Sequence, residues 1–427
     1  MKPPARLSSV ILWSVISAAF IGPGTVTTAV SAGSQYGVSL LWAISFATLA
    51  CIALQEISAR IAIASGLTLG ESLMKKFGPQ KGKSLQWIVG GSVVMGCAAY
   101  EAGNMLGAVA GLQLVTSLPE KILTVVVAIG AGLVLWWGGK QWISHLMTLL
   151  VVVMGGAFAA VAFAQPFQFT ELLAAAVVPA MPAGAGMLVL GLVGTTIVPY
   201  NIFLGAGISK GETIPLMRVG LIVSICIGGL ITAAILLAGV SVSRFSSFSE
   251  LGAALGAQTG TWASTALALG LFAAGFSSAI TSPYASSVIA TTVFGTTRAW
   301  VAKLVAAGVL LIGFAFGISG VKPIPVILMV QALNGLLLPL LTFYLIWMVN
   351  DVSIVPRQHQ HGRGYNFILL LILFAVSVIG LHSISRSIGS AFGFEISNHL
   401  QWVIAVAAIA TGYASLRVFR KESAIGN

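Results

Sequence analysis

Twelve apolar segments, each long enough to cross a lipid bilayer, constrain this chain more than any other feature of its sequence. A transmembrane helix needs about 20 consecutive apolar residues. A backbone in lipid must also pair its own polar groups, and the segments are too long for barrel strands. The sequence therefore predicts an all-α integral membrane protein. The predicted spans are 9–32, 38–65, 86–116, 121–138, 143–164, 185–208, 213–241, 262–293, 301–318, 323–349, 366–385 and 399–417.

The composition agrees, because charged residues make up only 7% of the 427-residue chain against about 25% in soluble domains. With the N-terminus in the cytoplasm, sixteen loop lysines and arginines lie on the inner side and four on the outer side. This bias predicts cytoplasmic N- and C-termini in an inner or plasma membrane. The net charge of +11 then reflects the orientation of the chain in the membrane. The expected partner of this charge is the lipid bilayer, and no nucleic acid is expected.

Two of the spans contain a proline where a helix break is costly. Residues 20–30 read FIGPGTVTTAV and residues 194–204 read GTTIVPYNIFL, which places Pro23 in the first span and Pro199 in the sixth. Proline lacks an amide donor and clashes with the preceding turn. A single break could be only a kink, but interrupted spans in two halves of a chain point to an inverted-repeat transporter and its binding site.

Polar residues follow the two breaks and are candidates for contact with a substrate. Thr25 and Thr28 lie just after the first break, and Tyr200 and Asn201 lie just after the second. Hydroxyl and carboxamide groups beside unwound backbone and half-helix ends can bind a small polar solute. The alternative is that the threonines bond back to their own helices.

Few ionisable residues lie within the predicted spans. Glu101 is in the middle of the third span with no basic residue within one turn, and a buried carboxylate is a functional candidate, here for proton coupling. Glu56 and Arg60 are spaced i,i+4 in the favourable order, which fits either a structural pair or a proton path. His359 and His361 lie in the loop PRQHQHGRG, which is predicted to be solvated, with metal contact as the alternative.

Four stretches, taken in order, resemble the Nramp family of metal-ion transporters, which share the LeuT fold. AAFIGPGTVTTAVSAGSQYG is similar to the family's first span, with its hallmark Asp-Pro-Gly-Asn, and VPYNIFL is similar to its sixth, with Met-Pro-His-Asn. LGLFAAGFSSAITSPYA and QALNGLLLPL are similar to its eighth and tenth spans. The resemblance implies a LeuT/APC-type fold of two inverted five-helix repeats, with helices 1 and 6 unwound in mid-membrane and two extra helices.

The whole chain, 1–427, is accordingly interpreted as one transmembrane transporter domain. Repeat 1 is expected at 8–164, repeat 2 at 185–349, and the two extra helices at 365–420. The sequence contains no nucleotide-binding motif and no converging nucleophile and base. It is therefore not predicted to be an enzyme or to need a cofactor, and an ion gradient is the implied energy source.

The sequence departs from the family pattern at the positions that hold the metal in typical members. Gly22, Thr25 and Val198 stand where the resemblance places the aspartate, asparagine and methionine ligands. Tyr200 replaces a histidine, and Asn201 is retained. Asn201 and Thr25 are thus the most that this chain offers a metal as side chains at these positions.

The resemblance also aligns Glu101 with a family aspartate on the proton route. Asn104 replaces a family glutamate, Arg60 matches a basic residue of the second span, and a second histidine is absent at about Gly205. The predicted substrate-binding residues are Gly22, Gly24, Thr25, Thr28, Val198, Tyr200, Asn201, Ser278 and Gln331. The predicted coupling residues are Glu101, Asn104, Glu56 and Arg60.

The loss of the carboxylate and the thioether makes this set of positions poorly suited to a bare metal ion. The predicted function is therefore secondary active transport of a small carboxylate or amino-acid-like solute by alternating access, driven by a proton or sodium gradient. The first alternative is a proton-coupled transporter of a divalent metal cation such as manganese, magnesium or iron. A channel or a non-transporting sensor is the second alternative.

Overall fold

The computed structural model of the protein describes residues 5–242, 245–293, 298–392 and 399–423. Every regular element in these ranges is helical, so the predicted all-α class is confirmed. The elements in chain order are α1 (Ala5–Phe20), α2 (Pro23–Tyr36), η1 (Gly37–Leu40), α3 (Leu41–Ser65), α4 (Leu69–Phe77), α5 (Pro79–Gln113), α6 (Glu120–Trp137), α7 (Lys140–Phe163), α8 (Phe169–Val177), α9 (Gly186–Thr196), α10 (Pro199–Ile208), α11 (Ile214–Gly239), α12 (Phe248–Thr259), α13 (Thr261–Val293), α14 (Ala299–Ile318), α15 (Pro323–Val349), η2 (Arg357–His359), α16 (Arg363–Phe392) and α17 (His399–Ser423).

Each predicted span coincides with one helix or with a broken pair of helices. Within the described ranges, nine helical runs are long and apolar enough to cross a membrane. Three shorter apolar helices, Ala5–Phe20, Leu337–Val349 and Gln401–Leu416, correspond to the start of the first span and to the tenth and twelfth spans. Helices α4, α8 and α12 lie in the connections between spans.

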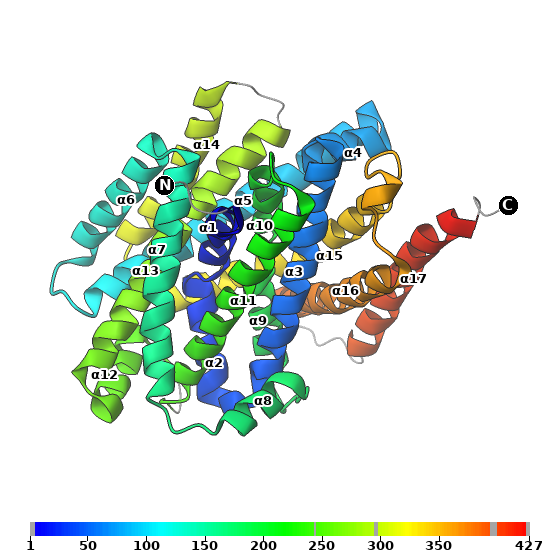
Figure 1. The fold of residues 1–427 in the computed structure, drawn as a ribbon. Coiled ribbons are helices and arrows are strands. Elements are labelled where there is room, and N and C mark those ends of the chain that lie inside the picture. Colours follow the sequence, from blue (N-terminus) through cyan, green and yellow to red (C-terminus); the bar gives the residue numbers. More distant parts are fainter. Residues whose placement is uncertain (1–4, 243–244, 294–297, 393–398, 424–427) are drawn as a thin grey trace.

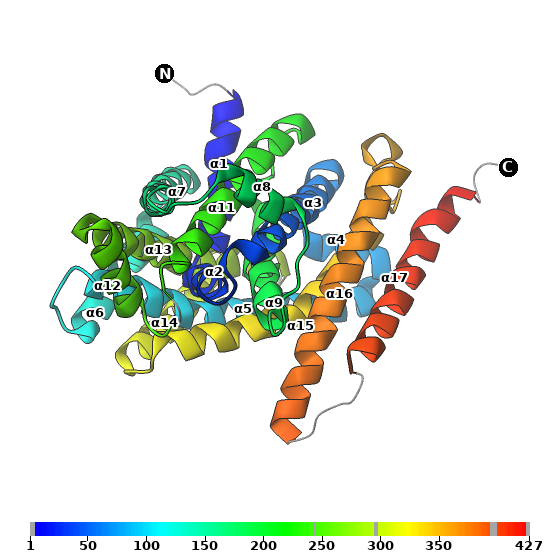
Figure 2. The same ribbon diagram turned by 90° about the horizontal axis from the view of Figure 1, so that it is seen from below.

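The two broken spans lie inside the bundle. Helix α1 packs against α7 and α11, and α2 packs against α9 and α11 (Figure 1). Helix α10 packs against α3 and α13. Helices α16 and α17 lie side by side at one edge of the molecule, away from α1 and α7, which is the place expected for additions to a core (Figure 2).

Both predicted helix breaks are present, and both are caused by proline. Helix α1 ends at Phe20, Gly22 is extended with φ −101° and ψ −177°, and Pro23 begins α2. Helix α9 ends at Thr196, and Pro199 begins α10. Proline is favourable at the first position of a helix because its missing amide proton has no helical partner there.

Glycines on α5 allow two other helices to approach its backbone closely, one of them at the first break. A Cβ on Gly107 would overlap Pro23 Cγ, and a Cβ on Gly111 would lie 2.5 Å from the Phe272 amide nitrogen of α13. The backbone of α5 is therefore in direct contact with the start of α2 and with α13.

We expect Gly107→Ala to lower the free energy of unfolding by about 1–3 kcal/mol, because the new methyl group must displace the Pro23 ring in a packed core. Thermal unfolding of the purified protein in detergent measures this loss. Gly96→Ala is the matched control on the same helix, since a Cβ at Gly96 would meet nothing within 4 Å. An equal loss in the two variants would show that the contact with Pro23 is not the cause.

Candidate functional site at the helix breaks

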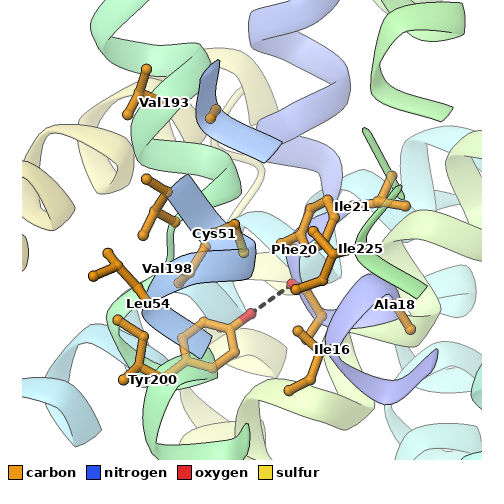
Figure 3. Packing of buried hydrophobic residues seen from close by; sticks show 14 of the residues in the cluster. Ile16, Ala18, Phe20, Ile21, Cys51, Leu54, Val193, Val198, Tyr200 and Ile225 are labelled. Carbon is orange, nitrogen blue, oxygen red and sulfur yellow. Dashed lines mark hydrogen bonds between the residues drawn. The ribbon is translucent and has the colours of Figure 1, made fainter. Parts of the chain in front are cut away.

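The first break removes helical donors from the carbonyls at the end of α1. Pro23 has no amide proton for the Ala19 carbonyl, four residues earlier. The Tyr200 hydroxyl of α10 donates to this carbonyl at 2.8 Å instead, and Figure 3 shows its ring reaching toward the end of α1. The Thr25 hydroxyl donates to the Phe20 carbonyl. Two of the predicted substrate-binding hydroxyls are thus engaged in holding α1.

Two serines of α13 complete this arrangement. Ser277 Oγ lies 3.2 Å and Ser278 Oγ 3.4 Å from the Ala18 carbonyl oxygen, to which both hydroxyls donate. The sequence predicts exposed backbone groups at the break, but the carbonyls of Ala18, Ala19 and Phe20 are all hydrogen-bonded by hydroxyls. The physical reason is that unpaired carbonyls inside a membrane are costly.

Asn201 and Thr28 are buried near the breaks with unused polar atoms. Asn201 is 0% exposed, and neither its side-chain nitrogen nor its oxygen has a hydrogen-bond partner in the described ranges. The Thr28 hydroxyl also lacks one among the described residues. Thr28 faces α9, since a Cβ on Gly191 would lie 2.7 Å from its methyl carbon. Both side chains are thus buried with polar atoms that the described residues leave unpaired.

The other predicted residues contribute less to the chemistry of the site. Val198 is the N-cap of α10, and its carbonyl oxygen accepts a hydrogen bond from the backbone N–H of Asn201 at 3.1 Å. Gly24 is buried in the first turn of α2. Gln331 belongs to α15, but its side chain lies outside the part of the chain whose side chains the structure describes.

A carboxylate lies close to the first break, on α5. Glu101 is 0% exposed, and its Oε2 accepts a hydrogen bond from Asn104 Nδ2 at 3.3 Å. Its Oε1 has no hydrogen-bond partner among the residues described. A Cβ on Gly22 would lie 2.8 Å from Ser278 Oγ and 3.5 Å from Asn104 Oδ1. Side chains from α5 and α13 therefore pack against Gly22 and fill the space that a larger residue there would occupy.

Packing from two sides encloses Glu101. The Tyr100 and Tyr200 rings meet edge to face, with centroids 5.6 Å apart. Helix α14 approaches from another side, since a Cβ on Gly313 would lie 2.6 Å from Glu101 Cγ. Charge interactions are strongest in such an enclosed place of low dielectric constant.

The predicted pair of Glu56 and Arg60 is formed, and it belongs to a larger cluster. Glu56 Oε1 lies 2.5 Å from Arg60 Nη2 and 2.9 Å from Arg218 Nε of α11. Glu56 Oε2 lies 2.8 Å from His361 Nε2. The prediction that His361 is solvated is wrong, because its side chain is 5% exposed and stacks on Tyr365 with ring centroids 4.1 Å apart.

Sequence reasoning missed Gln55, which lies beside the second broken span. A Cβ on Gly205 would overlap Gln55 Oε1, so Gln55 fills the space next to the position at which the resemblance places a histidine. Gln55 is 1% exposed, and its Oε1 has no hydrogen-bond partner in the part of the chain described. A buried amide directly before Glu56 in an apolar span is the signal that could have found it. Sequence reasoning also missed Ser277, Arg218 and the partnership of His361.

In the described residues, no group of three or more histidine, cysteine, aspartate or glutamate side chains could hold a metal ion. The side chains at the first break instead offer amide and hydroxyl oxygens together with one carboxylate. Such donors suit a hard cation that keeps part of its hydration shell, or a polar solute.

Residues 14–386 match the family model described as natural resistance-associated macrophage protein-like, or Nramp. The chain belongs to this family. A relative from Verminephrobacter eiseniae, named divalent metal cation transporter MntH, is 27% identical over 401 residues, or 86% of this chain and 90% of the relative. A protein of the same name from Deinococcus radiodurans is 28% identical over 64% of this chain and 66% of its own length.

Solved structures of the manganese transporter from Eremococcus coleocola have the same fold. The complex with an aromatic bis-isothiourea substituted compound superposes with a TM-score of 0.77 at 19% identity, covering 97% of this chain and 95% of the other. The structure of a mutant of the same transporter gives a TM-score of 0.75 at 18% identity, with the same coverage of both chains. The LeuT-type fold of two inverted five-helix repeats plus two helices is thereby confirmed. This Nramp-family chain is an integral membrane transporter and not an enzyme.

Proposed function

We propose that this chain transports a divalent cation by alternating access, with Glu101 as the anionic partner of the cation. The observation that carries the proposal is the unused Oε1 of Glu101, for which the described residues supply no partner. The other carboxylate oxygen accepts a hydrogen bond from Asn104, whose Oδ1 would lie 3.5 Å from a Cβ on Gly22 at the first break. An unpaired carboxylate costs several kcal/mol in a membrane interior. A cation arriving at the break, or a proton in its absence, supplies the missing positive charge.

The donors beside Glu101 favour a hard cation that keeps some of its water. Asn104 and Ser278 bring amide and hydroxyl oxygens. Asn201 follows the second break with a carboxamide left unused by the described residues, and Val198 stands where the resemblance expects a sulfur ligand. Mg²⁺ is commonly held by one or two carboxylates while it keeps several waters. Selection of a metal by softness needs sulfur or imidazole ligands, which these positions do not provide.

The names of the relatives support a cation as cargo. The Verminephrobacter and Deinococcus proteins are named divalent metal cation transporters. A small carboxylate, the cargo that the missing ligands suggest from sequence, has less support, because its charge would approach that of Glu101. The hydroxyls of Thr25, Tyr200 and Ser278 are also already donating to α1. A channel or a sensor has less support than a transporter from the paired breaks.

We further propose that the cation is coupled to protons through Glu101 rather than to sodium. The proton would leave when the cation arrives, since both compete for one carboxylate. Asn104 would hold the second oxygen in either state. The excess of basic residues in one set of loops supports cytoplasmic termini. The helix bounds and the two breaks support repeats at 8–164 and 185–349.

Ligand-induced stabilisation tests this function. A ligand at 100 times its Kd raises the free energy of unfolding by about 2.7 kcal/mol. We expect Mg²⁺ or Mn²⁺ to raise the Tm of the purified protein in a saturable way, and Asn201→Ala to weaken this effect. The exposed Thr265→Ala serves as control. A rise in Tm with small carboxylates but with no divalent cation would contradict the proposal.

A further inference from the structure

Glu56 joins three segments of the chain through its two carboxylate oxygens. Oε1 contacts Arg60 of its own helix, α3, and Arg218 of α11, while Oε2 faces His361 of the segment between α15 and α16. Among the described groups, the Glu56 Oε2 atom therefore has an ion-pair partner only in His361.

The segment that carries His361 is fixed to α3 at a second point. Arg60 Nη1 donates to the His359 carbonyl at 2.6 Å. Tyr365, in the first turn of α16, supports the imidazole from the other side by stacking. The segment between α15 and α16, here called the connector, thus contacts α3 through one ion pair and one hydrogen bond, and contacts α16 through one pair of stacked rings.

Alternating access in transporters with inverted repeats moves one part of the bundle against the other. Helix α3 belongs to the first proposed repeat, while α11 and the connector belong to or follow the second. The cluster therefore spans parts that must shift relative to one another. Separating them would remove Arg218 and His361 from Glu56, leaving Arg60 of the same helix as its one remaining partner among the described residues, and loss of partners from a buried charge is costly.

We propose that His361 is a proton-binding residue whose contact with Glu56 holds α3, α11 and the segment between α15 and α16 together. This contact is called the lock below. The charged and titratable groups facing it are Glu56 and Arg60 from α3, Arg218 from α11 and Tyr365 from α16. Protonation turns the contact with Glu56 Oε2 into a pair of opposite charges 2.8 Å apart, and attraction between charges is strong where little solvent screens them. Arg218 opposes protonation only weakly, because its side chain is 46% exposed to solvent.

The sign follows from the charge of the pair. The contact between His361 and Glu56 joins opposite charges only when the imidazole is protonated. The lock is therefore stronger at acidic pH than at alkaline pH. The inference rests on the proposed function only in requiring α3 to move. With cytoplasmic termini, the lock would respond to internal pH and slow the transporter after protons have entered with the cargo.

A native cysteine near the second break can report the opening of this face. Cys51 lies on α3, is 1% exposed, and is close to Leu54 and Val198 in the core (Figure 3). Replacing Cys97 with alanine and Cys226 with serine leaves Cys51 as the single thiol of the chain, which has three cysteines. Its alkylation by N-ethylmaleimide in detergent then measures how often the core becomes accessible.

We expect His361→Gln to speed alkylation of Cys51 about fivefold near pH 5.5 and to leave it nearly unchanged near pH 8, because only the protonated imidazole attracts the Glu56 carboxylate. Comparing the two proteins at each pH cancels the pH dependence of the thiol itself. His359→Gln is the control, because only the backbone carbonyl of His359 contacts Arg60. A ratio that does not vary with pH, or that rises with pH, would overturn the proposal.

His361→Arg provides a second test if the glutamine variant folds poorly. A permanent positive charge beside Glu56 should keep alkylation near pH 8 as slow as that of the parent protein near pH 5.5. Fast alkylation of this variant at both pH values would also overturn the proposal. The assay contains no divalent cation, so failure of cation binding would leave its outcome unchanged, and the two proposals fail separately.

Discussion

Glu101→Gln is expected to reduce uptake of the divalent cation into proteoliposomes by at least about tenfold, which corresponds to about 1.4 kcal/mol. The variant keeps the size of the side chain and its contact with Asn104, but removes the one carboxylate that the described residues bring to the first break. A dehydrating cation would then face neutral oxygens in an enclosed site. The Tm rise caused by Mg²⁺ or Mn²⁺ should disappear in the same variant.

A carboxylate far from the break serves as the control. Glu171 is exposed on α8, and Glu171→Gln should leave uptake and the Tm rise unchanged. If Glu101→Gln keeps the cation-induced Tm rise and loses only the response to a proton gradient, Glu101 acts in coupling and does not contact the cation. If it keeps both, neither role stands.

Glu56→Ala is expected to lower the free energy of unfolding by about 3 kcal/mol, because removing one partner of a buried ion pair leaves the other charge without compensation. Arg60 is the group left behind, and its side chain is 5% exposed. The connector before α16 would lose its contact through His361 at the same time. Equilibrium unfolding in mixtures of mild detergent and dodecyl sulfate measures the loss.

Arg218→Ala separates the buried part of this cluster from its exposed part. Arg218 contacts the same Glu56 oxygen as Arg60, but its side chain is 46% exposed. Exposed ion pairs contribute about 0–1 kcal/mol, so this variant should lose far less stability than Glu56→Ala. Equal losses of unfolding free energy in the two variants would mean that solvent reaches the whole cluster. The burial of Arg60 would then not determine how much the cluster stabilises the protein.

The two clusters show how the chain compensates for its departures from the family pattern. Gly22 offers no side-chain ligand at the first break, and Asn104 of the neighbouring helix α5, which contacts this position, is hydrogen-bonded to the Glu101 carboxylate. Tyr200 offers a hydroxyl where the resemblance expects an imidazole, and this hydroxyl binds the carbonyl that Pro23 leaves without a donor. The first change adjusts the charge of the site, and the second stabilises the break itself.

The spans, both helix breaks and the pair of Glu56 and Arg60 could be predicted from the sequence, because each depends on local chemistry. Apolar length fixes a membrane helix, a missing amide proton fixes a break, and the helical period brings residues i and i+4 together. The loss of the family's metal ligands is likewise visible from sequence. It suggested a site without negative charge, because Glu101 appeared to belong only to a proton route.

Only the tertiary structure decided which groups meet at the breaks. Tyr200 and the Ala19 carbonyl are 181 residues apart in the chain, and Arg60 and His359 are 299 residues apart. No local pattern encodes such contacts, since they depend on how whole helices pack against one another. The same packing placed Asn104, the hydrogen-bond partner of Glu101, against Gly22 and buried His361 against Glu56, and both proposals depend on these placements.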